Sequence, residues 1–161
     1  MTIFKVLRLE HVVARGLLEE IIERTTLSSA GANLEMTRKL VRDLRTMLIS
    51  HNRAEESVFY EALRELAHHP ELADTRAEEH HMIEELMEDL ESTSPRDDNW
   101  NEKLAVIKSQ IESHFAEEET VVFSTLDNVI DDDLGETLAR SFEVLRSELM
   151  RASSNTRSFH L

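Results

Sequence analysis

The sequence predicts an all-α fold: an antiparallel, up-down-up-down four-helix bundle followed by a short fifth helix at the C-terminal end. Composition gives the first reason, because the 161 residues include only 3 Gly and 2 Pro, the residues that most often interrupt helices. The second reason is that apolar residues recur every three or four positions in successive segments. The chain length fits one domain with one core.

The first two segments are typical of long helices joined by a short turn. Residues 4–25 place apolar side chains on one stripe, and the Ser-Ser-Ala-Gly run at 28–31 is expected to end this helix. Residues 34–66 continue the helical period. This second helix is expected to stop at the His-His-Pro run at 68–70, because proline disfavours helical conformation in the residue before it.

The next two segments repeat this arrangement. Residues 73–90 carry the third apolar stripe, and residues 100–125, including Val121, carry the fourth. Between them, Ser94 is expected to cap the fourth helix, with Pro95 at its first position. Short connections make neighbouring helices antiparallel, which predicts the bundle.

A fifth helix and a tail complete the predicted organisation. The acidic run at 131–133 suits a helix N-terminus, where the helix dipole favours negative charge, and an apolar stripe follows over 134–149. We expect the domain to cover residues 1–151 and the remainder, 152–161, to form a flexible tail.

Charge and composition exclude several classes of partner. A formal net charge of −15 repels nucleic acid, and no stripe of Lys and Arg with interleaved aromatic residues is present, so cations are the expected ligands. No apolar run approaches the roughly eighteen residues of a membrane span, and residues 1–13 do not resemble an export signal. We therefore expect no membrane partner and a cytoplasmic location. Because the chain has no Cys, nitrogen and oxygen atoms must hold any metal.

Six polar residues occupy positions where the helical period demands apolar ones. These residues are His11, His51, Glu55, His80, His114 and Glu118. Burying such groups without partners would cost several kcal/mol. In His51-x-x-x-Glu55 and in His114-x-x-x-Glu118, the imidazole and the carboxylate lie on the same helix face. The six residues are therefore predicted to hold metal.

The two halves of the chain repeat this pattern. Glu-His pairs at 10–11 and 79–80 open the two hairpins, and His-x-x-x-Glu-Glu runs at 51–56 and 114–119 close them. Two half-sites imply two metal ions, which carboxylates can bridge when the ions lie roughly 3.5 to 4 Å apart. Imidazoles and carboxylates without sulfur suit iron, with manganese and zinc as alternatives. Positions on the ions remain open for water, an oxo group or a diatomic ligand.

The order His, His-x-x-x-Glu, His, His-x-x-x-Glu resembles the haemerythrin-like HHE cation-binding family, over nearly all of the chain before residue 130. The resemblance implies an oxo- or hydroxo-bridged di-iron centre that binds dioxygen or reacts with peroxide or nitric oxide. In some members the centre senses iron or repairs damaged iron centres. The resemblance makes the four His residues terminal ligands, with Glu55 and Glu118 as the bridges. Oxygen-carrying members add a fifth His, and this chain has Glu84 at one of its positions, which argues against reversible oxygen carriage.

Four further residues are secondary candidates for metal ligation or for contacts to the ligands. These are Glu56, His81, Glu84 and Glu119. His81 is expected to face outward, because His80 keeps the register of the apolar stripe. Glu56 and Glu119 could replace the glutamates that precede them, or could lie on a solvated face. Glu84, one turn after His80, could be an extra ligand or a hydrogen-bond acceptor.

Three functions are compatible with this pattern. The preferred one is a non-haem di-iron protein that binds or reacts with dioxygen, peroxide or nitric oxide, whether or not it turns them over as an enzyme. The second is a metal, oxygen or redox sensor, or an iron-binding module without turnover. The third is a structural helical interaction protein, metal-bound or metal-free. Tyr60, the only tyrosine, could pack near the site, but an ordinary core or interface role is the expectation.

Overall fold

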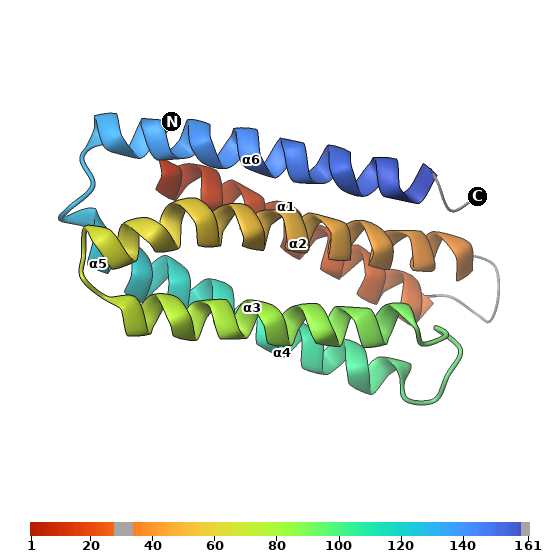
Figure 1. Cartoon of the computed structure of the whole chain (residues 1–161). Coiled ribbons are helices and arrows are strands. Elements are labelled where there is room, and N and C mark those ends of the chain that lie inside the picture. The colour runs from red at the N-terminus through yellow and green to blue at the C-terminus, as the bar shows by residue number, and fades with distance from the viewer. Residues whose placement is uncertain (28–33, 159–161) are drawn as a thin grey trace.

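The computed structural model describes residues 1–27 and 34–158, and these residues form helices and connecting turns, which confirms the all-α prediction. The bundle consists of α1 (Ile3–Leu27), α2 (Leu34–Glu65), α3 (Pro70–Glu91) and α4 (Trp100–Glu117). Figure 1 shows these helices side by side, and α6 (Asp132–Ser158) lying along α1 and α2. The expected end of the first helix at 28–31 falls outside the described residues.

The connection before α4 differs from the prediction. The fourth helix begins at Trp100 and not at Pro95. The Ser94 backbone N–H donates to Asp97 Oδ2 (3.3 Å), and the Arg96 N–H donates to Ser94 Oγ (3.3 Å). The side chain of Ser94 therefore stabilises a turn instead of capping the helix.

The fourth bundle helix contains a π-helical segment that begins at a predicted bridging glutamate. This segment, η1 (Glu118–Val122), follows α4 directly and leads into α5 (Phe123–Asp127). Such segments widen one helical turn and occur frequently at functional sites. The wider turn shifts the buried face by one position, so that Val122 is buried, whereas Val121, which we expected on the apolar stripe, is 50% exposed.

The C-terminal helix is longer than the short helix we expected. α6 has 27 residues and continues through 152–158, which we expected in the tail. The Ser154 hydroxyl donates to the Met150 carbonyl (3.1 Å), so a side chain that could compete with the helix is bonded to the helix backbone instead.

The apolar core consists of two clusters. One includes Leu44, Trp100 and Ile107, and the other includes Phe59 and Phe142, all at most 2% exposed. Along each bundle helix, the predicted metal-binding residues lie where the buried apolar residues change from one cluster to the other. Hydrophobic burial on both sides therefore stabilises a polar layer between the clusters.

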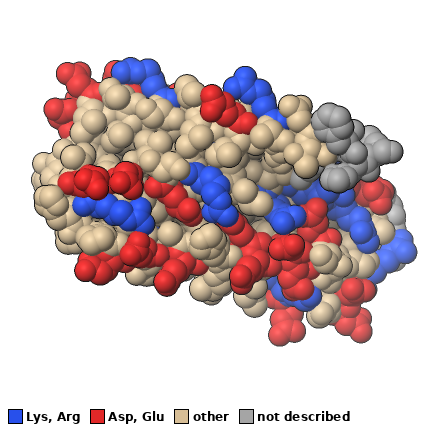
Figure 2. Space-filling model, in the orientation of Figure 1, with Lys and Arg blue, Asp and Glu red and all other residues tan. Residues whose placement is uncertain are grey.

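The outer surface carries mixed charge. Figure 2 shows Asp and Glu side chains distributed across the drawn face, with Lys and Arg side chains between them. Acidic residues predominate in the chain, with 33 Asp and Glu against 18 Lys and Arg. Among the residues that the structure describes, no helix is long and apolar enough to cross a bilayer.

Replacing Leu44 by alanine tests the core assignment. We expect Leu44→Ala to lower the free energy of unfolding by about 2–5 kcal/mol, because a fully buried leucine leaves a cavity when it is truncated. Leu66, which is 40% exposed, is the control, and Leu66→Ala is expected to cost at most about 1 kcal/mol. Urea denaturation followed by circular dichroism measures both, and equal losses would contradict the assignment.

Candidate metal centre

The structure brings the six predicted metal-binding residues into the polar layer between the two apolar clusters. α1 supplies His11, α2 supplies His51 and Glu55, α3 supplies His80, α4 supplies His114, and η1 begins with Glu118. Each of these residues is at most 3% exposed. Residues four apart on a helix share one face, which explains why each His-x-x-x-Glu run directs both side chains inward.

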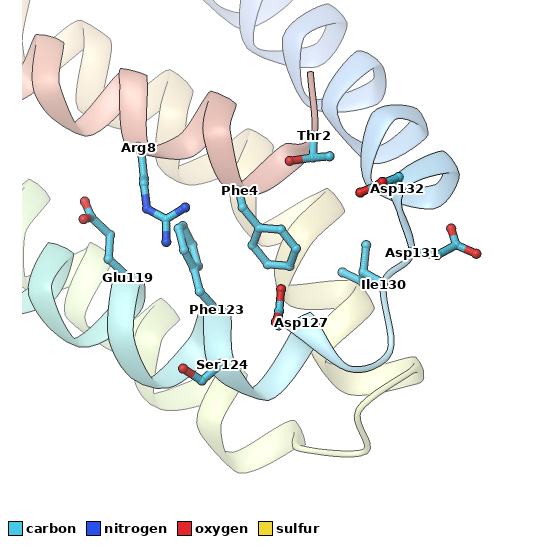
Figure 3. A pocket seen from close by; sticks show the side chains of 10 residues that line it. All are labelled: Thr2, Phe4, Arg8, Glu119, Phe123, Ser124, Asp127, Ile130, Asp131 and Asp132. Carbon is cyan, nitrogen blue, oxygen red and sulfur yellow. The ribbon is translucent and has the colours of Figure 1, made fainter.

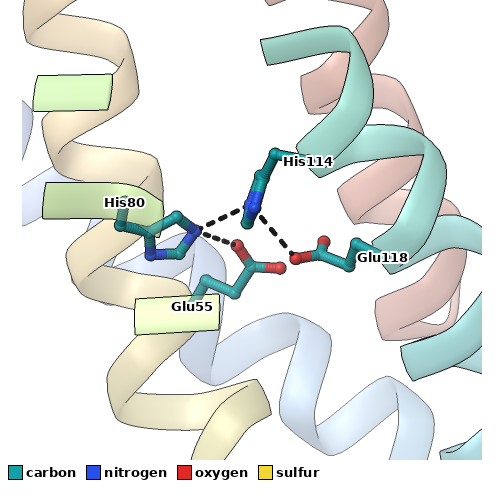
Figure 4. A group of neighbouring side chains, drawn as sticks. All are labelled: Glu55, His80, His114 and Glu118. Atoms are coloured by element: carbon teal, nitrogen blue, oxygen red, sulfur yellow. Dashed lines mark hydrogen bonds and ion pairs between the residues drawn. The ribbon is translucent and has the colours of Figure 1, made fainter. Parts of the chain in front are cut away.

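Glu55, His80, His114 and Glu118 form the first of two groups. Figure 4 shows their side chains converging, with Glu55 from α2, His80 from α3, and His114 and Glu118 from the continuous helix formed by α4 and η1. His80 Nε2 lies 3.0 Å from His114 Nε2 and 3.4 Å from Glu55 Oε2. His114 Nε2 lies 3.6 Å from Glu118 Oε2. The ligand atoms of this group all lie within 4.8 Å of one another, close enough for one metal ion.

The second group consists of His11, His51 and Glu55, and it shares Glu55 with the first. His51 Nε2 lies 3.3 Å from Glu55 Oε2, the same oxygen that faces His80. Glu118 also contacts both groups, because its Oε1 lies 3.4 Å from His11 Nε2 while its Oε2 faces the first group. Two ions bridged by these carboxylates fit this arrangement.

A carboxylate lies behind the Nδ1 atom of every imidazole in the layer. The Nδ1 to carboxylate distances are 2.7 Å for His11–Glu119, 2.8 Å for His80–Glu56, 2.7 Å for His114–Glu79 and 3.8 Å for His51–Glu10. An ionised carboxylate only accepts hydrogen bonds, so the proton of each closely paired imidazole is on Nδ1. This pattern, in which Nδ1 is held and Nε2 is left free, is typical of histidines that bind metal.

If both imidazoles are neutral, the Nε2 atoms of His80 and His114 face each other with no proton between them. Two lone pairs 3.0 Å apart repel each other unless a cation or a donor lies between them. Ligands at right angles around an ion, with bonds of about 2.1 Å, lie about 3.0 Å apart. Further buried atoms, including His11 Nε2, His51 Nε2 and both oxygens of Glu55, have no hydrogen-bond partner among the described residues. Since buried polar atoms are normally paired, the donor set fits a pair of cations.

The two central carboxyl groups differ in protonation. Burial raises the pKa of Glu55, and the neighbouring charge of Glu118 raises it further. Burial also opposes ionisation of Glu118, but polar contacts with His11 and Glu55, together with the nearby imidazole of His114, outweigh burial and hold its pKa well below the usual range. Without a cation, Glu55 therefore keeps the proton and Glu118 carries the charge.

Each outer carboxylate is in turn paired with an arginine. The shortest distances are 3.3 Å for Glu119–Arg15, 3.5 Å for Glu56–Arg53, 2.9 Å for Glu79–Arg76 and 3.5 Å for Glu10–Arg146. Partial burial opposes ionisation of Glu10, Glu56 and Glu79, yet the histidine beside each one and nearby positive charges lower the pKa of each. These carboxylates therefore stay ionised behind the imidazoles.

The secondary candidates from the sequence lie outside the inner layer. Glu56 and Glu119 are the outer partners of His80 and His11, and both are partly exposed. His81 is exposed, as expected. Glu84 accepts hydrogen bonds from Asn52 Nδ2 (3.0 Å) and from Arg53 (2.7 Å), which holds it away from the imidazoles. The sequence did carry a signal for the outer carboxylates, because Glu-His and Glu-Glu pairs recur in both halves of the chain. We nevertheless predicted no role for Glu10 or Glu79.

Tyr60 lies against the centre, which is the alternative to the core or interface role that we expected. Its hydroxyl donates to Glu118 Oε2 (2.7 Å) and lies 3.2 Å from His80 Nε2, and its ring stacks on the imidazole of His80. Burial raises the pKa of Tyr60 well above its usual value, and the charges of Glu118 and Glu55 raise it further. The phenol therefore keeps its proton. Tyr60 lies one turn beyond Glu56, and a buried phenol hydroxyl needs a partner; this need was the available signal.

A surface pocket of about 380 Å³ reaches the outer side of the centre. Figure 3 shows Glu119 at its wall, beside Arg8 and the ring of Phe123. The Arg8 guanidinium lies 4.8 Å from the centroid of that ring. Because Glu119 also accepts from His11 Nδ1, one carboxylate separates this pocket from an imidazole of the inner layer.

Comparisons with known proteins agree with this geometry. The family model described as Hemerythrin HHE cation binding domain matches residues 2–126. A solved structure of a hemerythrin HHE cation binding domain-containing protein from Mycobacterium kansasii is 27% identical, with a TM-score of 0.72, over 92% of this chain and 89% of that chain. No curated protein sequence matches the chain. The family resemblance is thus confirmed, and the chain belongs to the hemerythrin HHE cation-binding domain family.

Proposed function

We propose that this protein is a non-haem di-iron protein that binds or reacts with small oxidants such as dioxygen, peroxide or nitric oxide. In this proposal His80 and His114 hold one ion, His11 and His51 hold the other, and Glu55 and Glu118 bridge them. The observation that carries the proposal is the facing pair of Nε2 atoms of His80 and His114, 3.0 Å apart, with both Nδ1 atoms committed to carboxylates.

The chemistry of the donors supports iron. The inner layer offers imidazole nitrogens and carboxylate oxygens, and the chain has no Cys that would favour a thiolate-bound metal. Manganese and zinc accept similar ligands and are the alternatives. Six protein residues leave positions open on two six-coordinate ions, and iron bound there would supply redox chemistry with a small ligand.

Burial supports a small substrate. The six residues are at most 3% exposed, and apolar clusters close the layer from both ends of the bundle. Such an enclosure admits molecules of a few atoms and excludes large ones. Within it, the Tyr60 hydroxyl keeps its proton next to Glu118, and it is the group we propose to donate a hydrogen bond to the incoming oxidant.

A sensor or iron-binding module is the second candidate. Four imidazoles and two carboxylates in the core destabilise the metal-free fold, so occupancy of the centre would couple to the stability of the whole bundle. A protein partner could respond to that change without any turnover of oxidant. Nucleic acid is not proposed as a partner, given the net charge of −15.

The neighbours His80 and His81 offer a matched test of the ligand set. His80→Ala removes a buried imidazole of the first group, so we expect bound iron to fall from about two ions per chain to one or fewer. His81→Ala changes the next, exposed residue and should leave iron unchanged. Elemental analysis after reconstitution with ferrous iron measures both, and full iron content in His80→Ala would rule out the assignment.

The spectrum of the aerobically purified protein tests the redox proposal. We expect near-ultraviolet absorption from an oxo bridge between two ferric ions, and we expect it to change when peroxide or nitric oxide is added. The metal-free protein treated in the same way is the control. If protein refolded with ferrous iron contained zinc or no metal, the redox proposal would be ruled out. The third function, a structural helical protein, would then be the remaining one.

Replacing Tyr60 by phenylalanine separates metal binding from reactivity. Tyr60→Phe removes a hydroxyl while it keeps the packing of the ring against His80. We expect about two irons to remain, and the rate of peroxide consumption to fall on the order of 100-fold, because a positioned hydrogen-bond donor is lost. Stopped-flow absorbance measures the rate. Loss of an iron ion would instead make the phenol oxygen a metal ligand.

A further inference from the structure

The four pairs of imidazole and outer carboxylate are not equivalent. Three have Nδ1 to oxygen distances of 2.7 or 2.8 Å, whereas His51 Nδ1 lies 3.8 Å from Glu10 Oε2. Among the described residues, neither of these last two buried atoms has a hydrogen-bond partner. The orientation of His51 therefore depends more on its other neighbours than the orientation of the other three imidazoles does.

The arginine that pairs with Glu10 also differs from the other three in the helix that supplies it. Arg15, Arg53 and Arg76, which support the three close pairs, belong to α1, α2 and α3. Arg146, which lies 3.5 Å from Glu10 Oε1, belongs to α6. The family model ends at residue 126, so this support comes from outside the matched domain.

A second residue of α6 contacts His51 directly. Phe142 lies one turn before Arg146 on the same face of the helix, and it is fully buried. Its ring meets the His51 imidazole edge to face, with centroids 5.6 Å apart and an angle of 78° between the planes. α6 therefore contacts both His51 and the carboxylate behind it.

α6 packs over the half of the centre that contains His11 and His51. Figure 1 shows α6 along α1 and α2, the helices that carry His11 and His51. The approach is close where α6 begins, because a Cβ added at Gly135 would lie 3.2 Å from Thr2 Cβ. The opposite half, with His80 and His114, has two close carboxylate pairs and the Tyr60 hydroxyl.

We propose that Arg146 and Phe142 are positioning residues for the ion held by His11 and His51, and that α6 controls the occupancy of this half of the centre. The proposal rests on the di-iron function. Arg146 holds the Glu10 carboxylate behind His51, and Phe142 fixes the plane of the imidazole. Disturbing either contact releases this ion first, while the ion held by His80 and His114 remains.

Metal release from the full-length protein tests the proposal. Wild type, Arg146→Gln, Arg146→Lys and Phe142→Leu are loaded anaerobically with ferrous iron and then titrated with a chelator. We expect one of the two ions in Arg146→Gln and in Phe142→Leu to bind roughly 10- to 100-fold more weakly, with the other unchanged. Arg146→Lys, which keeps the charge, should restore part of the affinity. Arg140→Gln is the control, because Arg140 lies on the same helix and is 68% exposed.

A structural role of α6 would give a different result. If α6 only covers the bundle, the variants would weaken both ions equally and lower the melting temperature of the metal-free protein, and that result would overturn the proposal. Unchanged release of both ions would overturn it as well. If wild-type protein bound no iron at all, the di-iron function itself would fail, so the two failures are distinguishable.

A double-mutant cycle tests whether Arg146 acts through Glu10. The release of the weaker ion is compared in Glu10→Gln, Arg146→Gln and the double variant. If the arginine acts by holding the carboxylate, Arg146→Gln has no further effect once Glu10 is neutral. Independent effects that multiply in the double variant would show that Arg146 does not position His51 through Glu10.

Discussion

The burial of four imidazoles and two carboxylates in one layer of the core is the constraint on which the rest of the structure depends. Such a layer costs free energy unless its polar atoms are paired. Carboxylates on the outer side pair with Nδ1 atoms, and arginines pair in turn with those carboxylates. The outer carboxylates are therefore balanced by arginines, whereas the negative charge of Glu118 at the middle of the layer has no arginine beside it among the described ion pairs, and a cation bound there would neutralise it.

The same constraint explains why the apolar core is split. A single continuous cluster would leave no level at which side chains from four helices could meet without apolar atoms between them. Leu44 and Phe59, on α2, lie on opposite sides of the layer in different clusters. The hydrophobic clusters fix the helices, and the helices fix the distances between donors, so that a rigid scaffold positions the centre.

The bundle and the buried positions of the inner residues could be predicted from the sequence, because both follow from the helical period of the apolar residues. His80, not His81, continues the stripe of α3, and the buried position follows from that register. Features that depend on contacts between distant segments were not accessible. Nothing near Tyr60 in the sequence shows that its hydroxyl meets Glu118, which lies 58 positions later. The π-helical turn at η1 and the full length of α6 also depend on packing and on hydrogen bonds to the backbone, which local propensity describes poorly.

Tyr60 breaks the internal symmetry of the molecule. It follows His51 by nine positions, and the residue at the same place after His114 is Phe123, which has no hydroxyl. Phe123 instead packs with Phe4 and Phe59, away from the inner layer. His11 and His80 hold equivalent places in the two repeats, yet the phenol hydroxyl lies 3.2 Å from His80 Nε2, whereas His11 stacks on the ring of Phe115. A duplicated sequence thus builds a site whose two sides differ chemically, so a small molecule bound there would not find them interchangeable.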